Sequence, residues 1–448
     1  MKGPRLSSEE LADALGRRLG GTVVGLRRLS GGASRVTSAF ELEDAGDGRH
    51  PLILQMDRGA APPGRVRMER DLLQAAGAAG VPVPGVVALG EGDELGASWL
   101  VVERLEGETI PRKILRDENW GRARTVLAAQ CGRALAGIHR VGPDALDQLP
   151  GRDPLRDPSS VLDTLHVTRP VTELAVRWLR VHPIDERELT VVHGDFRLGN
   201  LLVDGDGLRG VLDWELAHRG DPREDIGWLC ARTWRFGGSG RVAGVSELSE
   251  FRDAYVAEGG ETFTDEDVTW WEIYAGTKWA AICAMQCAAH LSGASRSVEL
   301  AMIGRRICET EWDLLTTLDA TRPDALDEPP TRHESPAVLG HPTISELAEA
   351  LLETWDARLQ ASGDVTRRYA TRVERNALAI IDRELRLGGD VTSRHMQRLE
   401  ELGFSDDHGL VGAIREGELD DDLDEVATVL ASSIRDELLI ANPDYPTR

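Results

Sequence analysis

Short apolar or alternating segments, bounded by Gly, Pro and acidic residues, fill the chain between residues 22 and 104, and such a pattern is typical of β-strands. The expected strands are Thr22–Leu29, Val36–Leu42, Pro51–Met56, Val86–Leu89 and Ser98–Glu103. Helix-forming residues at Arg65–Ala79 separate the third strand from the fourth, and Gly80 and Pro82 end this helix. The pattern therefore predicts a small, mostly antiparallel sheet with one helix.

From about residue 121 onward the apolar positions recur at helical spacing. The expected helices include Thr125–His139, Thr172–His182, Glu247–Ala257 and Val268–His290. One strand-rich, Gly-containing island, Leu189–Leu216, interrupts this helical region. Loops held by a rigid scaffold are common places for binding and catalytic residues, so we expect the chemistry in this island.

A proline-rich segment, residues 320–342, indicates a linker between domains. Beyond it the pattern is helical again, with apolar stripes at Ile344, Leu347, Leu351, Leu352 and Trp355 and at Val373, Leu378, Ile381 and Leu385. We therefore expect four parts: a β-rich lobe at 1–104, a larger helical lobe at 105–319, the linker at 320–342 and a helical domain at 343–448.

Composition narrows the class of protein. The 448 residues include 52 Lys and Arg against 76 Asp and Glu, a net charge of -24. A non-specific nucleic-acid binder is excluded because it needs a basic face. Residues 341–448 hold 23 acids and 12 bases, so the tail carries a large share of the acidic excess. The run Asp420–Glu425 is expected to start a helix, where acids favour the positive end of the dipole.

No apolar run reaches the roughly 18 residues of a membrane span, and the first residues carry no leader-like apolar segment, so we expect a cytoplasmic protein without membrane contact. Five unevenly spaced cysteines do not form a disulfide framework. Cys283 and Cys287 lie four apart on a predicted helix, and we expect buried thiols there rather than metal ligands.

The sequence from His193 to Asp213 carries the candidate chemistry. An apolar strand leads to His193-Gly-Asp195, Asn200 follows five positions after Asp195, and a second strand ends at Asp213. Phosphoryl transfer to a hydroxyl needs a carboxylate that accepts a proton and oxygen ligands that hold Mg²⁺. The spacing matches the catalytic loop and metal-binding Asp of protein kinases. It predicts Asp195 as the base, Asn200 and Asp213 as metal ligands, and ATP and Mg²⁺ as cofactors.

Together with Leu212-Asp-Trp-Glu215, Gly220-Asp-Pro222 and Asp225-Ile-Gly-Trp228, this loop resembles the aminoglycoside phosphotransferase and choline kinase superfamily. Within it, the chain is most similar to the branch of kinase-like domains that some animals fuse to an acyl-CoA dehydrogenase. The resemblance covers about residues 20–315 and implies an α+β, bilobal protein-kinase-like fold with ATP in the cleft. In this chain an all-α domain would follow that fold.

The resemblance also implies roles for residues outside the loop. Ser30, Gly31, Gly32, Ala33 and Ser34 would cover the phosphates, although two glycines between strands are also typical of an ordinary hairpin turn. Glu69 would pair with the phosphate-binding cation, and backbone groups from Glu103 to Leu105 would hold adenine at the hinge. Asp221 and Asp225 would steady the catalytic loop, or cap the helix that follows.

The third strand departs from the family pattern, because Gln55 occupies the place of the basic residue that contacts the phosphates. The only lysines are Lys2, Lys113 and Lys278, and none lies on this strand. An arginine is therefore needed, and our hypothesis names Arg35 or Arg58.

Two classes of function compete. The first is an ATP- and Mg²⁺-dependent phosphotransferase that acts on a hydroxyl of a small molecule, such as a hydroxyacyl-CoA, an amino alcohol or an aminoglycoside. The second, which Gln55 favours, is a nucleotide-binding pseudokinase that regulates or scaffolds through its acidic tail. In either case we expect no nucleic-acid partner, and residues 343–448 are the expected surface for a protein partner or self-association.

Overall fold

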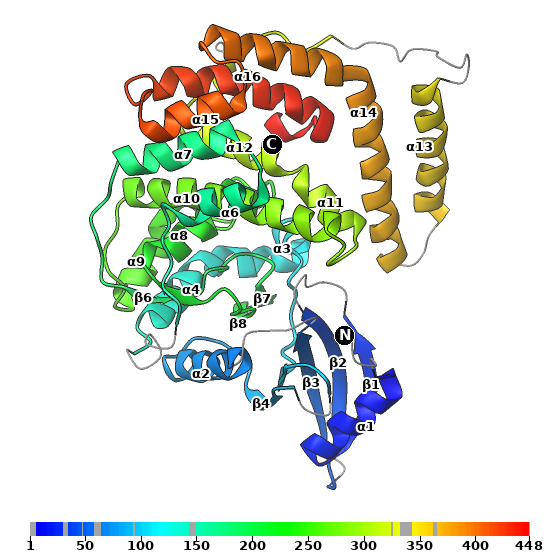
Figure 1. The fold of residues 1–448 in the computed structure, drawn as a ribbon. Helices are drawn as coiled ribbons and strands as arrows, with labels where there is room; N and C mark the ends of the chain where they lie inside the picture. Colours follow the sequence, from blue (N-terminus) through cyan, green and yellow to red (C-terminus); the bar gives the residue numbers. More distant parts are fainter. Residues whose placement is uncertain are drawn as a thin grey trace. The chain divides into compact units, whose positions relative to one another are not determined.

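The computed structural model describes residues 6–29, 35–46, 48–57, 64–92, 95–142, 149–323, 326–331, 343–361 and 365–447 (Figure 1). The chain forms two compact units. Unit 1 comprises Met1–Arg152, Glu186–Cys230 and Trp234–Thr264. Unit 2 comprises Asp153–Asp185, Ala231–Thr233 and Asp265–Arg448. Each unit therefore draws on segments that are far apart in the sequence.

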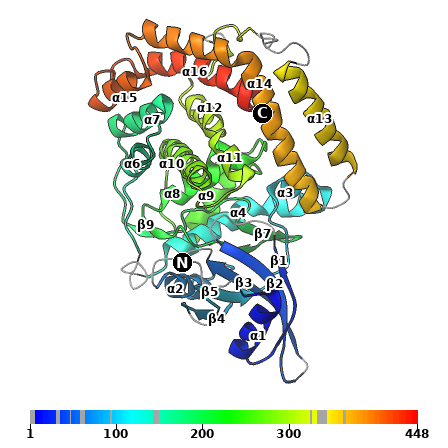
Figure 2. The same cartoon turned by 45° about the vertical axis from the view of Figure 1, so that its right-hand side comes forward.

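A five-stranded antiparallel sheet begins unit 1 (Figure 2). Its strands are β1 (Thr22–Arg28), β2 (Arg35–Glu43), β3 (Arg49–Asp57), β4 (Val86–Gly90) and β5 (Trp99–Glu103), in the order β1-β2-β3-β5-β4. Helix α2 (Arg65–Ala78) connects β3 to β4. The predicted strands and helix are thus confirmed with small shifts at their ends.

Helix α1 (Ser8–Leu19) precedes the sheet and was not predicted. It packs against β1, and its Leu15 joins a core with Phe40, Leu54 and Trp99 of the sheet. The sequence does carry a signal for this helix, since Ser7 and Glu10 form a capping box at its start.

The remainder of unit 1 holds the island that the sequence singled out. Its elements are α3 (Pro111–Arg116), α4 (Gly121–His139), β6 (Thr190–Val192), β7 (Leu201–Asp204), β8 (Gly207–Val211), β9 (His218–Gly220), α8 (Arg223–Cys230) and α9 (Leu248–Ala257). Strand β6 pairs with β9, and β7 pairs with β8, both antiparallel. These two short ladders fix both ends of the loop 193–200.

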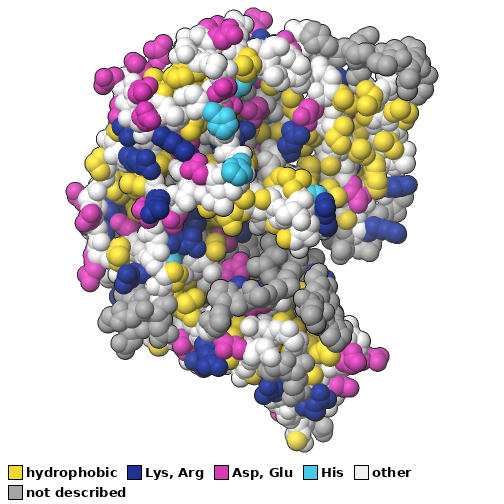
Figure 3. Space-filling model, viewed as in Figure 1, with side chains coloured by type: hydrophobic (Ala, Val, Ile, Leu, Met, Phe, Trp, Pro, Cys, Tyr) yellow, Lys and Arg dark blue, Asp and Glu magenta, His cyan; other side chains and the backbone are white. Residues whose placement is uncertain are grey.

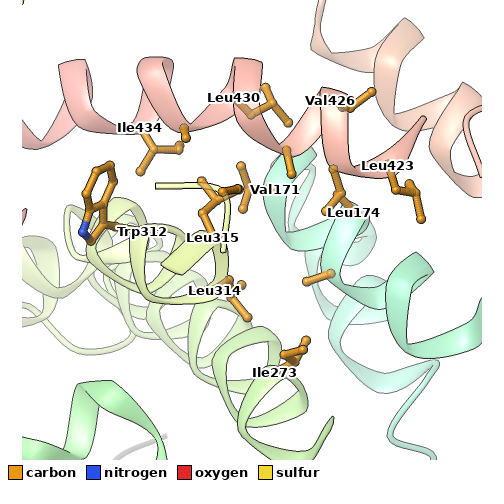
Figure 4. Close-up of a cluster of buried hydrophobic side chains, with 14 of the residues drawn as sticks. Val171, Leu174, Ile273, Trp312, Leu314, Leu315, Leu423, Val426, Leu430 and Ile434 are labelled. Carbon is orange, nitrogen blue, oxygen red and sulfur yellow. The ribbon is translucent and has the colours of Figure 1, made fainter. Parts of the chain in front are cut away.

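Unit 2 is helical. Its helices are α6 (Asp157–Leu165), α7 (Pro170–Val181), α10 (Asp265–Leu291), α11 (Val298–Gly304), α12 (Ile307–Thr317), α13 (Ile344–Ala361), α14 (Val365–Glu401), α15 (Asp407–Glu416) and α16 (Leu423–Ala441). Figure 4 shows Leu430 of α16 beside Val171 of α7 and Leu315 of α12 in one apolar cluster. The last helices of the chain therefore share a core with helices from residues 153–185 and 265–320. Together with the sheet, these helices confirm the predicted α+β class with an all-helical C-terminal region.

Arginines that each contact two acids reinforce this shared core. Arg415 of α15 bonds Glu173 of α7 at 2.6 Å and Asp163 of α6 at 2.8 Å. Arg169, just before α7, bonds Glu311 of α12 and, at 3.0 Å, Glu437 of α16. These contacts connect the same helices that the apolar cluster joins, so charge and packing act together in unit 2.

Helix α13 carries the predicted apolar stripe, and part of that stripe is exposed. Ile344, Leu347 and Leu351 remain 50–56% exposed, while α13 packs mainly against α14. Figure 3 shows hydrophobic side chains gathered over this helix pair. The helix is present as predicted, but only part of its apolar surface faces a neighbour. Within the part of the chain that the structure describes, none of the helices is long and apolar enough to cross a membrane.

The shared core of unit 2 predicts unequal costs for two leucine truncations in the tail. Leu430→Ala leaves a cavity among α7, α12 and α16 and should lower the free energy of unfolding by about 2–5 kcal/mol. Leu351→Ala, at a half-exposed position of α13, should change it by less than about 0.5 kcal/mol. Urea titrations followed by tryptophan fluorescence measure both, and equal midpoints for the two variants would contradict the shared core.

Candidate active site

The loop that follows β6 is fixed by one buried carboxylate. Asp225 of α8 is fully buried, and its two oxygens accept the backbone N–H groups of His193 at 2.7 Å and Gly194 at 2.9 Å. Its second oxygen also lies 3.3 Å from Nε2 of His139, whose Nδ1 lies 2.8 Å from the hydroxyl of Tyr255. Asp225 thus connects the loop to α4 and α9.

The electrostatics keep this carboxylate ionised. Burial works to raise its pKa, but the hydrogen bond and charge of His139 and the N–H of His193 together lower the pKa of Asp225 below its usual value. Gly194 is required beside it, because its φ is 78° and a Cβ there would lie 2.4 Å from the carbonyl oxygen of Leu216. The sequence His-Gly-Asp therefore encodes a tight turn on a buried charge.

Asp195 and Asn200 meet within this loop. Nδ2 of Asn200 donates to Oδ2 of Asp195 at 2.5 Å and to its backbone carbonyl at 3.0 Å. The backbone N–H of Asp195 donates to Nδ1 of His193 at 3.2 Å, so His193 shapes the loop. The amide nitrogen of Asn200 is thus turned toward the carboxylate. The two residues that the spacing paired are in direct contact.

Asp213 follows β8 in a left-handed backbone conformation, with φ of 63°. The N–H of the preceding Leu212 donates to the carbonyl of Asn200 at 2.8 Å, which brings Asp213 to the loop. Burial, and then the charges of Glu215, Asp195 and Glu69, raise the pKa of Asp213 to about 7. A non-glycine residue held in this conformation is characteristic of functional sites.

Arg35, one of the two arginines that our hypothesis names, is held by acidic residues beside Gln55. It begins β2, is only 6% exposed, and donates from Nη1 and Nη2 to both oxygens of Glu69 at 2.9 and 2.5 Å. Its Nε donates to Asp57 at 3.1 Å, and Nη1 also donates to Oε1 of Gln55 at 3.2 Å. Gln55 therefore accepts a bond from the cation and does not replace it. Although burial opposes charge, Glu69 raises the pKa of Arg35 above its ordinary value.

The charges around these residues form one network. Arg65 lies 3.0 Å from Glu215 and 3.6 Å from Asp57, which links the end of β3 to the residues after β8. The network contains five carboxylates and three guanidinium groups: Asp57, Glu69, Asp195, Asp213, Glu215, Arg35, Arg65 and Arg197. Carboxylates outnumber guanidinium groups in this network, and a bound cation would offset the excess of negative charge.

The donors suit a metal that is shared with phosphates. Among the described residues no three His, Cys, Asp or Glu side chains converge closely enough to hold a metal ion by themselves. Mg²⁺ in nucleotide sites commonly takes one or two protein oxygens and completes its shell with phosphate and water. One carboxylate and one amide oxygen, from Asp213 and Asn200, match that requirement.

The other predicted residues either lie outside the described residues or make their contacts elsewhere. Ser30, Gly31, Gly32, Ala33, Ser34 and Arg58 lie outside the described residues. Glu103 accepts the N–H of Gly85 at 3.2 Å, and Leu105 lies against Gly210 of β8. Asp221 bonds the guanidinium and the N–H of Arg223 at the start of α8, so it contacts the helix and not the loop.

Two residues at the candidate base were given no role from the sequence. Nε1 of Trp228 and Nε of Arg197 both donate to Oδ1 of Asp195, each at 2.8 Å. Both lie in motifs that the sequence singled out, but nothing in the spacing shows that a side chain from α8 reaches the loop 33 residues before it. Packing of α8 under the loop makes that contact.

A sheet-rich region followed by this loop defines the class of protein as a kinase-like phosphotransferase. The sequence profile of the phosphotransferase enzyme family matches residues 25–271, and the chain belongs to that family. A second profile, described as a domain of unknown function (DUF6285), matches residues 360–445.

Among curated proteins, the mouse (Mus musculus) acyl-CoA dehydrogenase family member 10 is 30% identical over 213 residues. That match covers 44% of this chain and 19% of the mouse protein, so the chain spans only about a fifth of that relative.

Solved structures share the fold. A protein from Ralstonia eutropha assigned to the aminoglycoside phosphotransferases matches with a TM-score of 0.53 at 22% identity, over 70% of this chain and 99% of that one. A spectinomycin phosphotransferase, in complex with ADP and spectinomycin, matches with a TM-score of 0.51 at 12% identity, again over 70% and 99%. At such identities the likeness shows the fold alone.

Asp225 predicts a stability cost that a surface aspartate does not share. In Asp225→Asn one backbone N–H of the loop faces an NH₂ group, and the unmet buried donor should lower the free energy of unfolding by about 1–3 kcal/mol. Asp206→Asn, at a side chain that is 79% exposed, should leave stability within about 0.5 kcal/mol. Thermal unfolding followed by circular dichroism compares them, and an unchanged midpoint for Asp225→Asn would refute the anchoring role.

Proposed function

We propose that this chain is an ATP- and Mg²⁺-dependent phosphotransferase that phosphorylates a hydroxyl of a small molecule. The assembly of Asp195, Asn200 and Asp213 around one loop is the observation that carries the proposal. Membership of the phosphotransferase family supports the reaction class. A scaffold has no need of a base next to two oxygen ligands, so the pseudokinase alternative is less well supported.

In the proposed reaction Asp195 accepts the proton of the acceptor hydroxyl. The acceptor oxygen forms a bond to the γ-phosphorus, the bond from that phosphorus to the bridging oxygen breaks, and ADP leaves with the electron pair. Asn200 and Asp213 would hold Mg²⁺, which neutralises charge on the phosphates when bound. Asp225 keeps the loop that carries Asp195 in a single conformation.

Phosphate binding is assigned to Arg35 in this proposal. Glu69 and Asp57 hold its guanidinium from two sides at the start of β2, directly after the residues Ser30–Ser34 that would cover the phosphates. Glu69 thus plays the part that the resemblance implied, with arginine in place of lysine. Backbone groups between Glu103 and Leu105 would hold adenine.

The acceptor remains a set of candidates within this proposal. The mouse relative is named an acyl-CoA dehydrogenase family member, which favours a hydroxylated acyl-CoA as the first acceptor to test. Amino alcohols and aminoglycosides form the second group, because structural neighbours are named for such drugs. The exposed apolar side of α13 is the proposed surface for a protein partner or self-association through residues 343–448.

Asp195→Ala tests the proposed base. We expect ATP consumption with a productive acceptor from this panel to fall by about 10²–10⁴-fold, because general base catalysis is lost while the fold is kept. Asp206→Asn is the control and should retain activity. Wild-type protein that binds Mg-ATP without any turnover across the panel would favour the pseudokinase.

Arg35→Gln tests the source of the phosphate-binding charge. The loss of a charged hydrogen bond should weaken the affinity for AMP-PNP by about 10–100-fold. The double variant Arg35→Gln with Gln55→Lys places a cation on β3, beside the position that Arg35 and Glu69 occupy. We expect this second substitution to recover part of the lost affinity for AMP-PNP.

Arg49→Gln, at an exposed arginine of β3, is the matched control and should bind AMP-PNP normally. Calorimetric titration measures all four proteins, and thermal unfolding checks that each is folded. Normal affinity in folded Arg35→Gln would show that Arg35 does not contact the nucleotide.

A further inference from the structure

Arg197 and two tryptophans form a closed circuit of contacts with the candidate base. Nε of Arg197 donates to Oδ1 of Asp195 at 2.8 Å, and its guanidinium lies over the ring of Trp234, 4.3 Å from the centroid. Trp234 packs against Trp228 with ring centroids 5.3 Å apart, and Nε1 of Trp228 donates to the same Oδ1 at 2.8 Å. Each member therefore has two partners in the circuit.

These contacts determine which carboxylate oxygen of Asp195 can still accept a hydrogen bond from the acceptor hydroxyl. A carboxylate oxygen accepts about two hydrogen bonds. Oδ1 already receives two, from Arg197 and Trp228, whereas Oδ2 receives one from Asn200. The acceptor hydroxyl must therefore approach Oδ2, with Arg197 on the neighbouring oxygen.

The chain also makes room for the guanidinium. Gly199 has φ of 107°, and a Cβ there would lie 2.6 Å from Nη1 of Arg197. Nη1 donates to the carbonyl of Leu198 at 3.1 Å, which holds the guanidinium plane against the loop. A glycine, a carbonyl, an aromatic face and a carboxylate thus all fix one cation. Nη2 makes no hydrogen bond to any residue that the structure describes.

The distances that phosphoryl transfer requires would place the transferred phosphoryl group beside the guanidinium of Arg197. The acceptor oxygen must lie about 2.6–3.2 Å from Oδ2 of Asp195 to give up its proton. The phosphorus that it attacks lies roughly 3–3.5 Å further on before the bond forms. The equatorial oxygens of the phosphoryl group then come within reach of a guanidinium that already touches the same carboxylate. Negative charge on those oxygens is what a fixed arginine stabilises in such reactions.

We propose that Arg197 is a further catalytic residue that binds the phosphoryl group during its transfer, through Nη2. Trp234 and Trp228 fix the positions of the Arg197 and Asp195 side chains relative to each other. This inference rests on the proposed function. The oxygen to phosphorus bond that forms and the bridging bond that breaks are those given above, and the proton still passes to Asp195. Arg197 exchanges no proton or electron and contributes charge only.

The test uses a transition-state mimic as well as turnover. Full-length wild-type protein and Arg197→Gln are titrated with Mg²⁺ and ADP, with and without aluminium fluoride, which mimics the phosphoryl group in flight. We expect Arg197→Gln to weaken binding of the ADP and aluminium fluoride complex by about 10²–10³-fold, while the affinity for ADP alone changes less than about threefold. The kcat should fall by a similar factor with little change in KM.

Three further proteins keep the outcome decisive. Arg197→Lys keeps a point charge without the planar fork and should recover part of the loss. Gly199→Ala keeps the arginine but displaces its guanidinium, and should weaken the mimic in the same direction. Arg209→Gln, at an exposed position of β8, is the control and should behave as wild type.

Arg197→Gln that binds the mimic as tightly as wild type overturns the inference. An equal loss of affinity for ADP alone and for the mimic also overturns it, because Arg197 would then only shape the loop. If Arg197→Gln does not fold, normal binding of the mimic by both Arg197→Lys and Gly199→Ala overturns it. Failure of the proposed function looks different, since wild-type protein itself would then show no turnover with any acceptor.

Discussion

The carboxylate of Asp225 is fully buried, and a buried charge is costly unless it is bonded from several sides. Two backbone N–H groups of the catalytic loop and the ring of His139 meet that requirement. Because Asp225 can be satisfied only when the loop is turned toward it, the loop conformation and the ionised state of Asp225 depend on each other. The positions of Asp195 and Asn200 follow from this arrangement, since both lie within the same short loop.

The charge at the other side of the site follows from strand register. Arg35 of β2 pairs with Asp57 of β3, which places both side chains on the face of the sheet that Glu69 of α2 approaches. Gln55 lies two residues before Asp57 on that same face and bonds the same guanidinium. Strand register and the approach of α2 therefore place a buried cation beside Gln55, at the strand position where the sequence lacks a basic residue.

Sequence patterns predicted those parts of the molecule that depend on short separations. The loop from Asp195 to Asn200 and the strand that ends before Asp213 are local, so spacing alone located them. Arg35 and Arg58 were alternatives in the sequence, because the contacts of Arg35 depend on pairing between β2 and β3 and on the approach of α2, which spacing does not show. The contact of Trp228 with the loop was not predictable, since it requires knowing how α8 packs.

The tail illustrates the same limit in another way. Periodicity predicted its helices, and the structure contains them. It did not show that Leu430 of α16 would be buried against α7 while Leu347 of α13 would be half exposed. Leu430 is covered by α7 and α12, whereas Leu347 lies on the part of α13 that α14 leaves exposed. Apolar residues at helical spacing predict a helix with an apolar face, but they do not show which neighbouring element packs against that face.

The scarcity of lysine is matched by arginines that each bond two acids, both at the candidate site and in the tail. The chain has 76 acids and 52 bases, and several of its arginines each bond two acids. Arginine can do so, because its planar group presents five donors in a fixed fork, whereas lysine is a point charge on a flexible stem. One arginine bonding two acids recurs at Arg35, Arg169, Arg386, Arg398 and Arg415. The pairing of Arg35 with Asp57 and Glu69 is therefore one instance of how this acidic chain distributes its positive charge.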